Sequence, residues 1–246
     1  MEFFVFIRGI LFSIHEFLLK DFKNKSYNTG VLIDMSRENK NVERFIAHVK
    51  SVALQHGVKI KIKNSRNVRE PAGNTLCCGY FLDSEKEKLI VIAKGKRPVQ
   101  EWLGFLVHEY CHMMQWIEKC PAYTNTFLKN GEDATYKLSL LENGEADYNK
   151  RLRNVYTKKT IACELDCERR AVKAIKKFNL PINLEAYKRG AAATLYKYWL
   201  LCNTGHWIGD SLEKRRSVMK AIKPSLRGQF NGVPKNVQEA LALKTT

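Results

Sequence analysis

Three residues of the segment HEYCH have the types and the spacing of a metal site. His108 and His112 are four positions apart, so on a helix both imidazoles project from one face and can reach a single ion. Zinc accepts neutral imidazole and carboxylate ligands in a tetrahedral site, and an open fourth position lowers the pKa of water there towards neutrality. Glu109 lies beside the two histidines and could act as the general base. The segment therefore indicates a zinc site with hydrolytic chemistry.

The segment belongs to an element that should be buried. From Pro98 to about Ile117 the sequence is apolar on nearly every face, which predicts a central helix that ends before Pro121. Such a helix has little reason to bury histidine, glutamate and histidine together unless their polar atoms share a partner. Gly104, one turn before His108, would let a second helix or a ligand approach closely.

A second helix, predicted from about Ile161 to Phe178, supplies the acidic ligands. Glu164 and Glu168 fall on or next to its apolar stripe, and two carboxylates in that position are costly unless a cation lies opposite them. We assign Glu164 as the third zinc ligand and Glu168 as the group that orients one histidine through its distal N–H, with the exchange of these two roles as the main alternative.

Other candidate ligands fit this arrangement less well. Asp166 projects from a different face of the second helix. Three thiols could bind zinc by type, but their faces are offset from the proposed ligands, so we interpret them as small buried residues: Cys111, Cys163 and Cys167.

The remaining patterns place these two helices in a mixed fold. They predict an N-terminal amphipathic helix, a short strand at 30–34, a helix at 39–56, a strand at 58–62, and a hairpin of 76–82 with 89–93. The stretch 121–160 is less regular, with a helix near 145–153, and helices follow at 183–201 and 211–222. The expected class is α+β and predominantly helical, with a small, mostly antiparallel sheet beside the HEYCH helix. We divide the chain into an N-terminal element (1–38), a core (39–182) and a basic helical extension (183–246).

The order of hairpin, HEYCH helix and acidic helix resembles a known family. It looks like the minimal gluzincins of the ImmA/IrrE kind, and HEYCH followed by ELDCERR is similar to a group of bacteriophage-encoded metallopeptidase-like proteins over residues 40 to 185. The resemblance implies a zincin-like fold and peptide hydrolysis, with His108, Glu109, His112 and Glu164 as the matching positions. Glu168 stands where the better-known members have Asp or Asn, and the 51 residues between His112 and Glu164 suggest a substrate-shaping insertion.

The composition restricts the partners. The formal charge of +17 attracts nucleic acid, anionic membranes or acidic proteins. Seven cysteines in predicted helices and strands favour reduced thiols and a cytoplasmic location, which for a phage protein is the host cytoplasm, with virion association as an alternative. The apolar start of the chain is interrupted by Arg8 and is too short to span a bilayer.

Two functions remain open on this basis. The first is a zinc-dependent peptidase for a specific protein, with Leu89–Ala93 as an edge strand to which an extended substrate adds. The second is a basic nucleic-acid-binding or virion protein with a structural or vestigial zinc site. A hybrid of the two, a peptidase brought to DNA-bound substrates by its surface charge, is also open. The DNA-associated SprT-like peptidases would be one model for it, but they take their third ligand from histidine, and here only His206 follows HEYCH. Candidate donors to the oxyanion of peptide hydrolysis are Tyr156, Tyr187, Tyr196 and His206.

Overall fold

The computed structural model describes residues 6–8, 35–71, 76–206, 216–228 and 230–242. Its larger sheet has the strand order β1-β5-β6-β2, formed by Phe6–Arg8, Gly79–Asp83, Lys88–Ala93 and Lys59–Lys63. The β1–β5 and β5–β6 pairs are antiparallel, whereas β6–β2 is parallel. The hairpin prediction is confirmed, and the sheet is mixed. Strands β3 (Val68–Arg69) and β4 (Leu76–Cys77) form a separate antiparallel pair.

The expectation that Leu89–Ala93 is an edge strand is wrong. Strand β6 lies between β5 and β2, and Lys59 to Lys63 pair with Leu89 to Ala93 along its whole length. Its residues Leu89 to Ala93 are all buried, as expected for a strand with neighbours on both sides. The outer strand β2 alternates lysine with isoleucine and is mostly exposed, and lysines on an edge discourage pairing with other chains.

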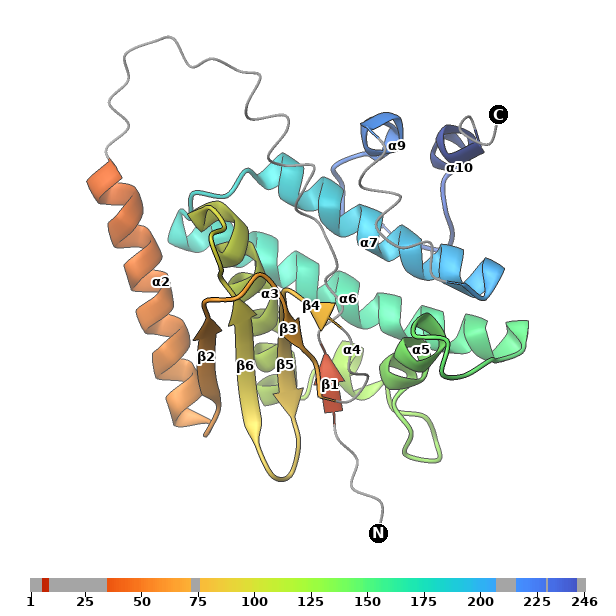
Figure 1. Ribbon diagram of the computed structural model, residues 1–246, viewed down its shortest axis with the longest axis horizontal. Coiled ribbons are helices and arrows are strands. Elements are labelled where there is room, and N and C mark those ends of the chain that lie inside the picture. Colours follow the sequence, from red (N-terminus) through yellow and green to blue (C-terminus); the bar gives the residue numbers. More distant parts are fainter. Residues whose placement is uncertain (1–5, 9–34, 72–75, 207–215, 229, 243–246) are drawn as a thin grey trace.

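The helices lie behind this sheet and beside it in the view of Figure 1. They are α2 (Met35–Gln55), α3 (Val99–Glu118), α4 (Pro121–Thr124), α5 (Ala134–Glu142), α6 (Lys150–Phe178), α7 (Leu184–Thr204), α9 (Arg216–Ala221) and α10 (Lys235–Ala242). Figure 1 shows α3 behind the sheet, the long α6 behind α3, and α7 alongside α6. The protein is thus an α+β structure with a small mixed sheet.

Helix α6 is longer than its apolar stripe suggested. It begins at Lys150 because the side chain of Asn149 accepts a hydrogen bond from the backbone N–H of Leu152 at 3.0 Å. The helix expected near 145–153 is therefore only the first turn of α6. In the stretch expected to be irregular, Asp133 caps α5 by accepting from the N–H of Thr135 at 2.7 Å.

Only part of the N-terminal segment is described by the structure, so only some of the elements predicted there can be compared with it. Residues 6–8 form a strand and not the expected helix, because their backbone pairs with Phe81 to Asp83. The rest of that helix and the strand expected at 30–34 lie outside the described residues, as do residues 211–215 of the helix expected at 211–222.

The core that holds α3 in place lies between the sheet and α6. Leu103, Leu106 and Met113 of α3 pack in one buried cluster with Phe45 of α2 and Ile90 of β6. A second cluster joins α5, α6, α7 and the C-terminal helices. The face of α3 that meets α6 is therefore buried.

Among the described helices, none has the length and apolar content needed to cross a membrane.

Candidate metal centre

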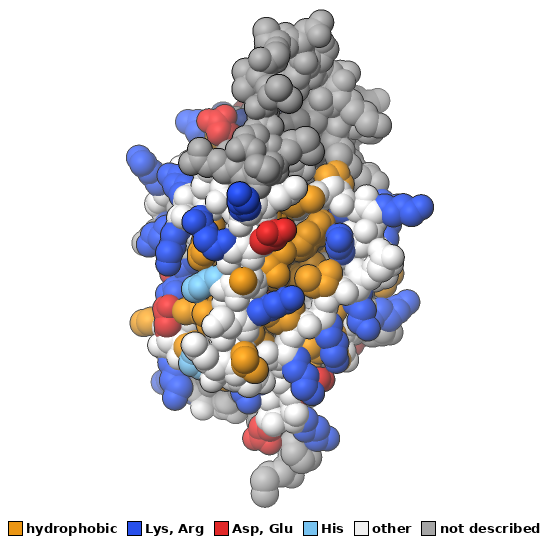
Figure 2. Space-filling model, turned by 90° about the vertical axis from the view of Figure 1, so that its left-hand side faces the viewer, with side chains coloured by type: hydrophobic (Ala, Val, Ile, Leu, Met, Phe, Trp, Pro, Cys, Tyr) orange, Lys and Arg blue, Asp and Glu red, His pale blue; other side chains and the backbone are white. Residues whose placement is uncertain are grey.

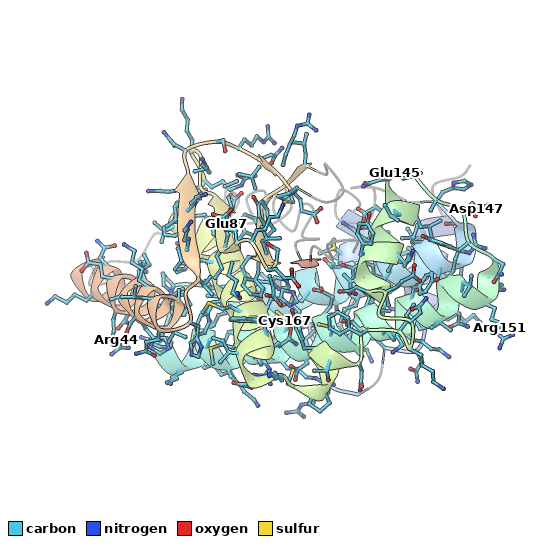
Figure 3. All side chains as sticks on the ribbon, turned by 90° about the horizontal axis from the view of Figure 1, so that it is seen from below. Arg44, Glu87, Glu145, Asp147, Arg151 and Cys167 are labelled. Atoms are coloured by element: carbon cyan, nitrogen blue, oxygen red, sulfur yellow. The ribbon has the colours of Figure 1, made fainter. Side chains whose placement is uncertain are left out.

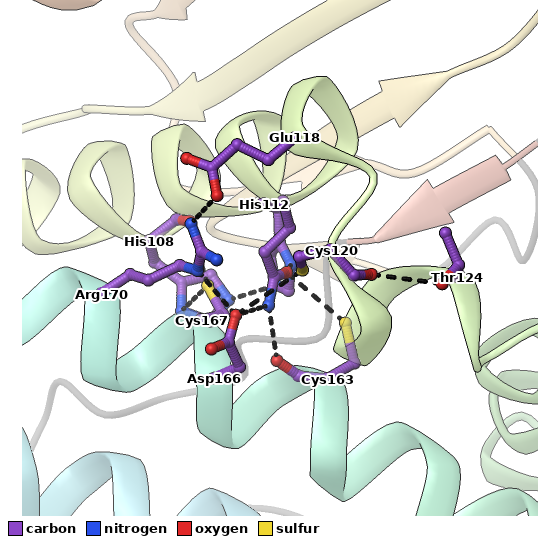
Figure 4. A network of polar contacts seen from close by, with 10 residues as sticks. His108, His112, Glu118, Cys120, Thr124, Cys163, Asp166, Cys167 and Arg170 are labelled. Atoms are coloured by element: carbon purple, nitrogen blue, oxygen red, sulfur yellow. Dashed lines mark hydrogen bonds and ion pairs between the residues drawn. The ribbon is translucent and has the colours of Figure 1, made fainter.

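His108 and His112 face each other on consecutive turns of α3. Both side chains are buried, and their Nε2 atoms are 2.9 Å apart. Figure 4 shows the two rings between α3 and α6. When both imidazoles are neutral, the two Nε2 atoms can share at most one proton. Both atoms point at the same position, where a bound cation would interact with their lone pairs.

Glu164 of α6 completes this arrangement. One of its carboxylate oxygens lies 3.4 Å from Nε2 of His112, and the other lies 3.5 Å from Nε2 of His108. Ligand atoms at the corners of a tetrahedral zinc site with bonds of about 2.0–2.1 Å are about 3.3 Å apart. The two nitrogens and the Glu164 carboxylate therefore have nearly the spacing that one small divalent ion requires, and the donor set fits zinc.

Glu168 lies on the other side of the His108 ring. One of its oxygens is 3.1 Å from Nδ1 of His108, so it holds the ring nitrogen that points away from Glu164. A carboxylate in this position fixes the tautomer that leaves Nε2 free to bind a metal. Behind Glu168 lies Tyr187 of α7, whose pKa is raised by burial and further by the charge of Glu168. The Tyr187 ring also faces Gly104, but a Cβ added there would lie 3.8 Å from it, an ordinary contact, so the predicted close approach does not require a glycine at this position.

The sequence analysis missed the group that orients His112. The Nδ1 atom of His112 lies 2.9 Å from Oε1 of Gln115, which is fully buried. The Gln115 amide in turn donates to the Cys163 carbonyl at 2.9 Å and to Asp166 at 2.8 Å. Its position three residues after His112, in an otherwise apolar stretch, was the available signal, because a buried amide needs partners for all its polar atoms.

Cys167 lies closer to the histidines than its helical position suggested. His108, His112 and Cys167 form a buried group whose potential ligand atoms are all within 4.8 Å of one another. This cluster could hold a metal ion, and Figure 3 shows Cys167 between α3 and α6. However, its sulfur lies 3.6 Å from Nδ1 of His108 and 3.3 Å from the His108 carbonyl, which is the Glu168 side of the ring. Glu164, by contrast, lies where the two Nε2 atoms meet.

The electrostatic environment of the centre favours a cation. Burial lowers the pKa of His108, but the carboxylates of Glu168, Glu109 and Glu164 more than offset this and raise it to about 10. Three acidic groups around one buried imidazole thus create a strongly negative local potential. A divalent ion would neutralise it in place of a proton.

Glu109 is the buried acid without a structural role in this network. Within the described part of the chain neither of its carboxylate oxygens makes a hydrogen bond of good geometry, although both are inaccessible to solvent; the Phe81 backbone N–H lies near enough to act on the carboxylate. Burial raises its pKa to about 8, the Glu164 charge acts in the same direction, and His108 and the Phe81 backbone amide oppose the rise. A buried carboxylate in this state is costly to stability, which is typical of a group retained for chemistry.

The other predicted candidates lie outside the centre. Asp166 accepts from Gln115 and from Arg170, and the Cys163 thiol contacts Gln115 at 3.5 Å. Of the suggested oxyanion donors, Tyr156 packs on Tyr148, Tyr196 packs on Phe230, and His206 is exposed. Tyr198, which was not among them, is fully buried, and after burial the charge of Glu164 is the main cause of its raised pKa.

Comparisons of the chain with protein-family models, curated proteins and solved structures give no match.

Proposed function

We propose that this protein is a zinc-dependent peptidase with a zincin-like arrangement of its metal-binding helices. The observation that supports this most is the combination of two convergent Nε2 atoms, a carboxylate at ligand spacing from both, and an adjacent buried Glu109. A purely structural zinc site has no need of that additional buried acid. The ligands are His108, His112 and Glu164.

The surrounding residues have separate tasks in this proposal. Glu168 and Gln115 hold the distal ring nitrogens of His108 and His112, so each imidazole presents Nε2. When bound, zinc supplies Lewis acidity and lowers the pKa of water at the site. Glu109 takes a proton from the attacking water and returns it to the leaving amine, a role suited to a carboxylate whose pKa is raised towards neutrality.

The substrate edge that suits this site is β5 and not β6. A Cβ atom added at Gly79 of β5 would lie 3.5 Å from Cγ of Glu109, so this strand approaches the proposed base directly. An extended peptide beside β5 would have its backbone held by the sheet and its carbonyl near Glu109. In the described structure β1 pairs with the same edge at Phe81 to Asp83. We infer that a substrate strand competes with β1 for this edge.

The substitution Glu109→Gln tests the proposed function. The variant should bind zinc with unchanged stoichiometry, because Glu109 does not contact the two Nε2 atoms, and should lose about 10²–10⁴-fold in the rate of peptide hydrolysis. Glu43→Gln, an exposed glutamate on α2, is the control for an equal change of charge. Hydrolysis of unfolded protein substrates is followed by release of labelled peptides, alongside zinc analysis.

Two results would contradict the proposal. Proteolysis that survives in Glu109→Gln excludes Glu109 as the base. A native chain that binds one zinc but cleaves none of a broad panel of peptides indicates a structural metal site in a non-enzymatic protein.

A further inference from the structure

A basic groove of about 950 Å³ lies beside the metal centre, between the second half of α3 and the second half of α6. The first part of α7 and the segment 226–228 contribute its other walls. Seven cationic and two acidic side chains line it, and the cationic ones are Arg169, Arg170, Lys173, Lys176, Lys177, Lys188 and Arg227. None of these residues belongs to the proposed zinc site.

The groove has fixed walls. Arg169 donates to the Leu226 carbonyl at 2.9 Å and to the Gly228 carbonyl at 2.7 Å, which fastens the segment 226–228 to α6. Arg170 bonds to Asp166 and to Glu118, each at 2.6 Å, and so links α6 to the end of α3 (Figure 4). Both acidic residues of the groove are therefore paired with the same arginine.

The other cations are available to a ligand. No ion pair within the described residues engages the remaining five, which are Lys173, Lys176, Lys177, Lys188 and Arg227. Like charges gathered along a groove with low-dielectric walls focus the field and attract an anionic polymer.

Two of the large apolar side chains in the lining, Phe178 and Leu226, offer little to a protein partner. Phe178 is buried, and the cationic groups of Arg44 and Lys177 lie over its ring at 5.8 and 5.4 Å from the centroid. Leu226 is also buried. Protein interfaces depend on exposed aromatic and aliphatic anchors, whereas a nucleic-acid backbone is bound mainly through its phosphates.

We propose that this groove binds the sugar-phosphate backbone of a nucleic acid without reading its sequence. Helix α6 then has two working faces: Glu164 and Glu168 point at the histidines, and Lys173, Lys176 and Lys177 line the groove. The groove lining contains none of the proposed zinc ligands, so this proposal does not depend on peptidase activity.

The test compares two triple variants of equal net charge. Lysines also cover other faces, such as the α2 side shown in Figure 2, so a loss of net charge alone must be controlled. The groove variant is Lys173→Gln, Lys176→Gln and Lys177→Gln. The control replaces three exposed lysines outside the groove, in Lys63→Gln, Lys96→Gln and Lys129→Gln. Binding of a short fluorescein-labelled DNA duplex is measured by anisotropy over a range of salt concentrations.

If the three lysines contact phosphates, the slope of log K against log salt should fall by about 2.7 in the groove variant, because each contact contributes about 0.9. Affinity at about 0.1 M salt should then drop by two to three orders of magnitude. The control should keep most of the slope. Should the groove variant fail to fold, as judged by circular dichroism, Lys188→Gln with Arg227→Gln tests the opposite wall, with an expected loss of about 1.8 in slope.

Three results would overturn the proposal. Equal losses in the groove and control variants would show that only net charge matters. An absence of DNA binding by the native chain at low salt would exclude the ligand. Polyglutamate that binds as tightly as DNA, with the same salt slope, would indicate an acidic protein as the partner.

Discussion

The assignment of Glu164 as third ligand leads to a measurable order of zinc affinities among three variants. Glu164→Gln removes a charged ligand that lies 3.4 and 3.5 Å from the two Nε2 atoms. Glu168→Gln removes only the charge that orients His108. Cys167→Ala removes the thiol on the Nδ1 side of His108. If the ligands are two nitrogens and Glu164, zinc affinity should fall most in the first variant and least in the third.

The sizes of these effects follow from the roles. Loss of an outer partner of a metal ligand costs about 10- to 100-fold in affinity, which is the range expected for Glu168→Gln. Loss of the ligand itself should exceed that range, on the order of 10³-fold, whereas Cys167→Ala should stay below about 10-fold. A variant that binds zinc 10³-fold more weakly loses about 4.1 kcal/mol of zinc-dependent stabilisation at saturating metal. For a chain of this size, that loss lowers the Tm measured with zinc by about 8–16 °C.

The assay is zinc competition against a chromophoric chelator, with Tm measured in the presence of zinc and in excess chelator. The metal-free Tm of each variant serves as its own reference, so direct effects of the substitution on folding are removed. A greater loss in Cys167→Ala than in Glu164→Gln would refute the proposed ligand set and favour a His-His-Cys site. A greater loss in Glu168→Gln would exchange the roles of the two glutamates.

Four further predictions concern the groups around the site. Gln115→Ala should weaken zinc binding by about 10- to 100-fold, because His112 loses the 2.9 Å contact that orients its ring, and chelator competition measures it; unchanged affinity would remove that role. Gly79→Ala should destabilise the fold by about 1–3 kcal/mol in urea unfolding, since the added Cβ would lie 2.9 Å from Ile92 and 3.0 Å from the Val91 carbonyl. Gly104→Ala should instead stabilise by up to about 1 kcal/mol, because its nearest neighbour would be 3.8 Å away; the reverse order would contradict both packing arguments. Ile7→Pro should weaken the pairing of β1 with β5 and raise the rate of peptide hydrolysis, and a lower or equal rate would argue against competition for that edge.

The local patterns predicted the helices of the site better than they predicted the sheet. The apolar run of α3 and the acidic stripe of α6 specify both the helical period and the faces that meet, so the proximity of Glu164 and Glu168 to His108 could be anticipated. Strand order depends on pairing between distant segments. The apolar run of β6 is compatible with a central strand, but it does not specify that β2 lies beside it in parallel and β5 on its other side.

The side chains that support the site were harder to foresee. Gln115 is one residue among many polar ones until the structure shows that it is fully buried. The position of Tyr187 behind Glu168 depends on how α7 crosses α6, which helical periodicity does not determine. Cys167 shows the same limit: it was expected on a face offset from the histidines, but the packing of α3 on α6 brings its sulfur against His108.

The two faces of α6 constrain each other, because Asp166 belongs to both networks. It accepts from Gln115, which orients His112, and from Arg170, which braces the groove against Glu118. A phosphate that draws Arg170 away from Asp166 would leave the Gln115 amide with a stronger acceptor, and the hydrogen bond between Gln115 and His112 would change with it.

Since coupling between two sites is reciprocal, zinc should then alter the affinity for DNA by the same factor by which DNA alters the affinity for zinc. Anisotropy titrations with and without zinc measure one side of this equality, and chelator competition with and without DNA measures the other. If the two affinities change by equal factors in the native chain and by no factor in Asp166→Asn, the coupling is assigned to this shared carboxylate. If neither ligand changes the affinity for the other in the native chain, the two faces of α6 act independently.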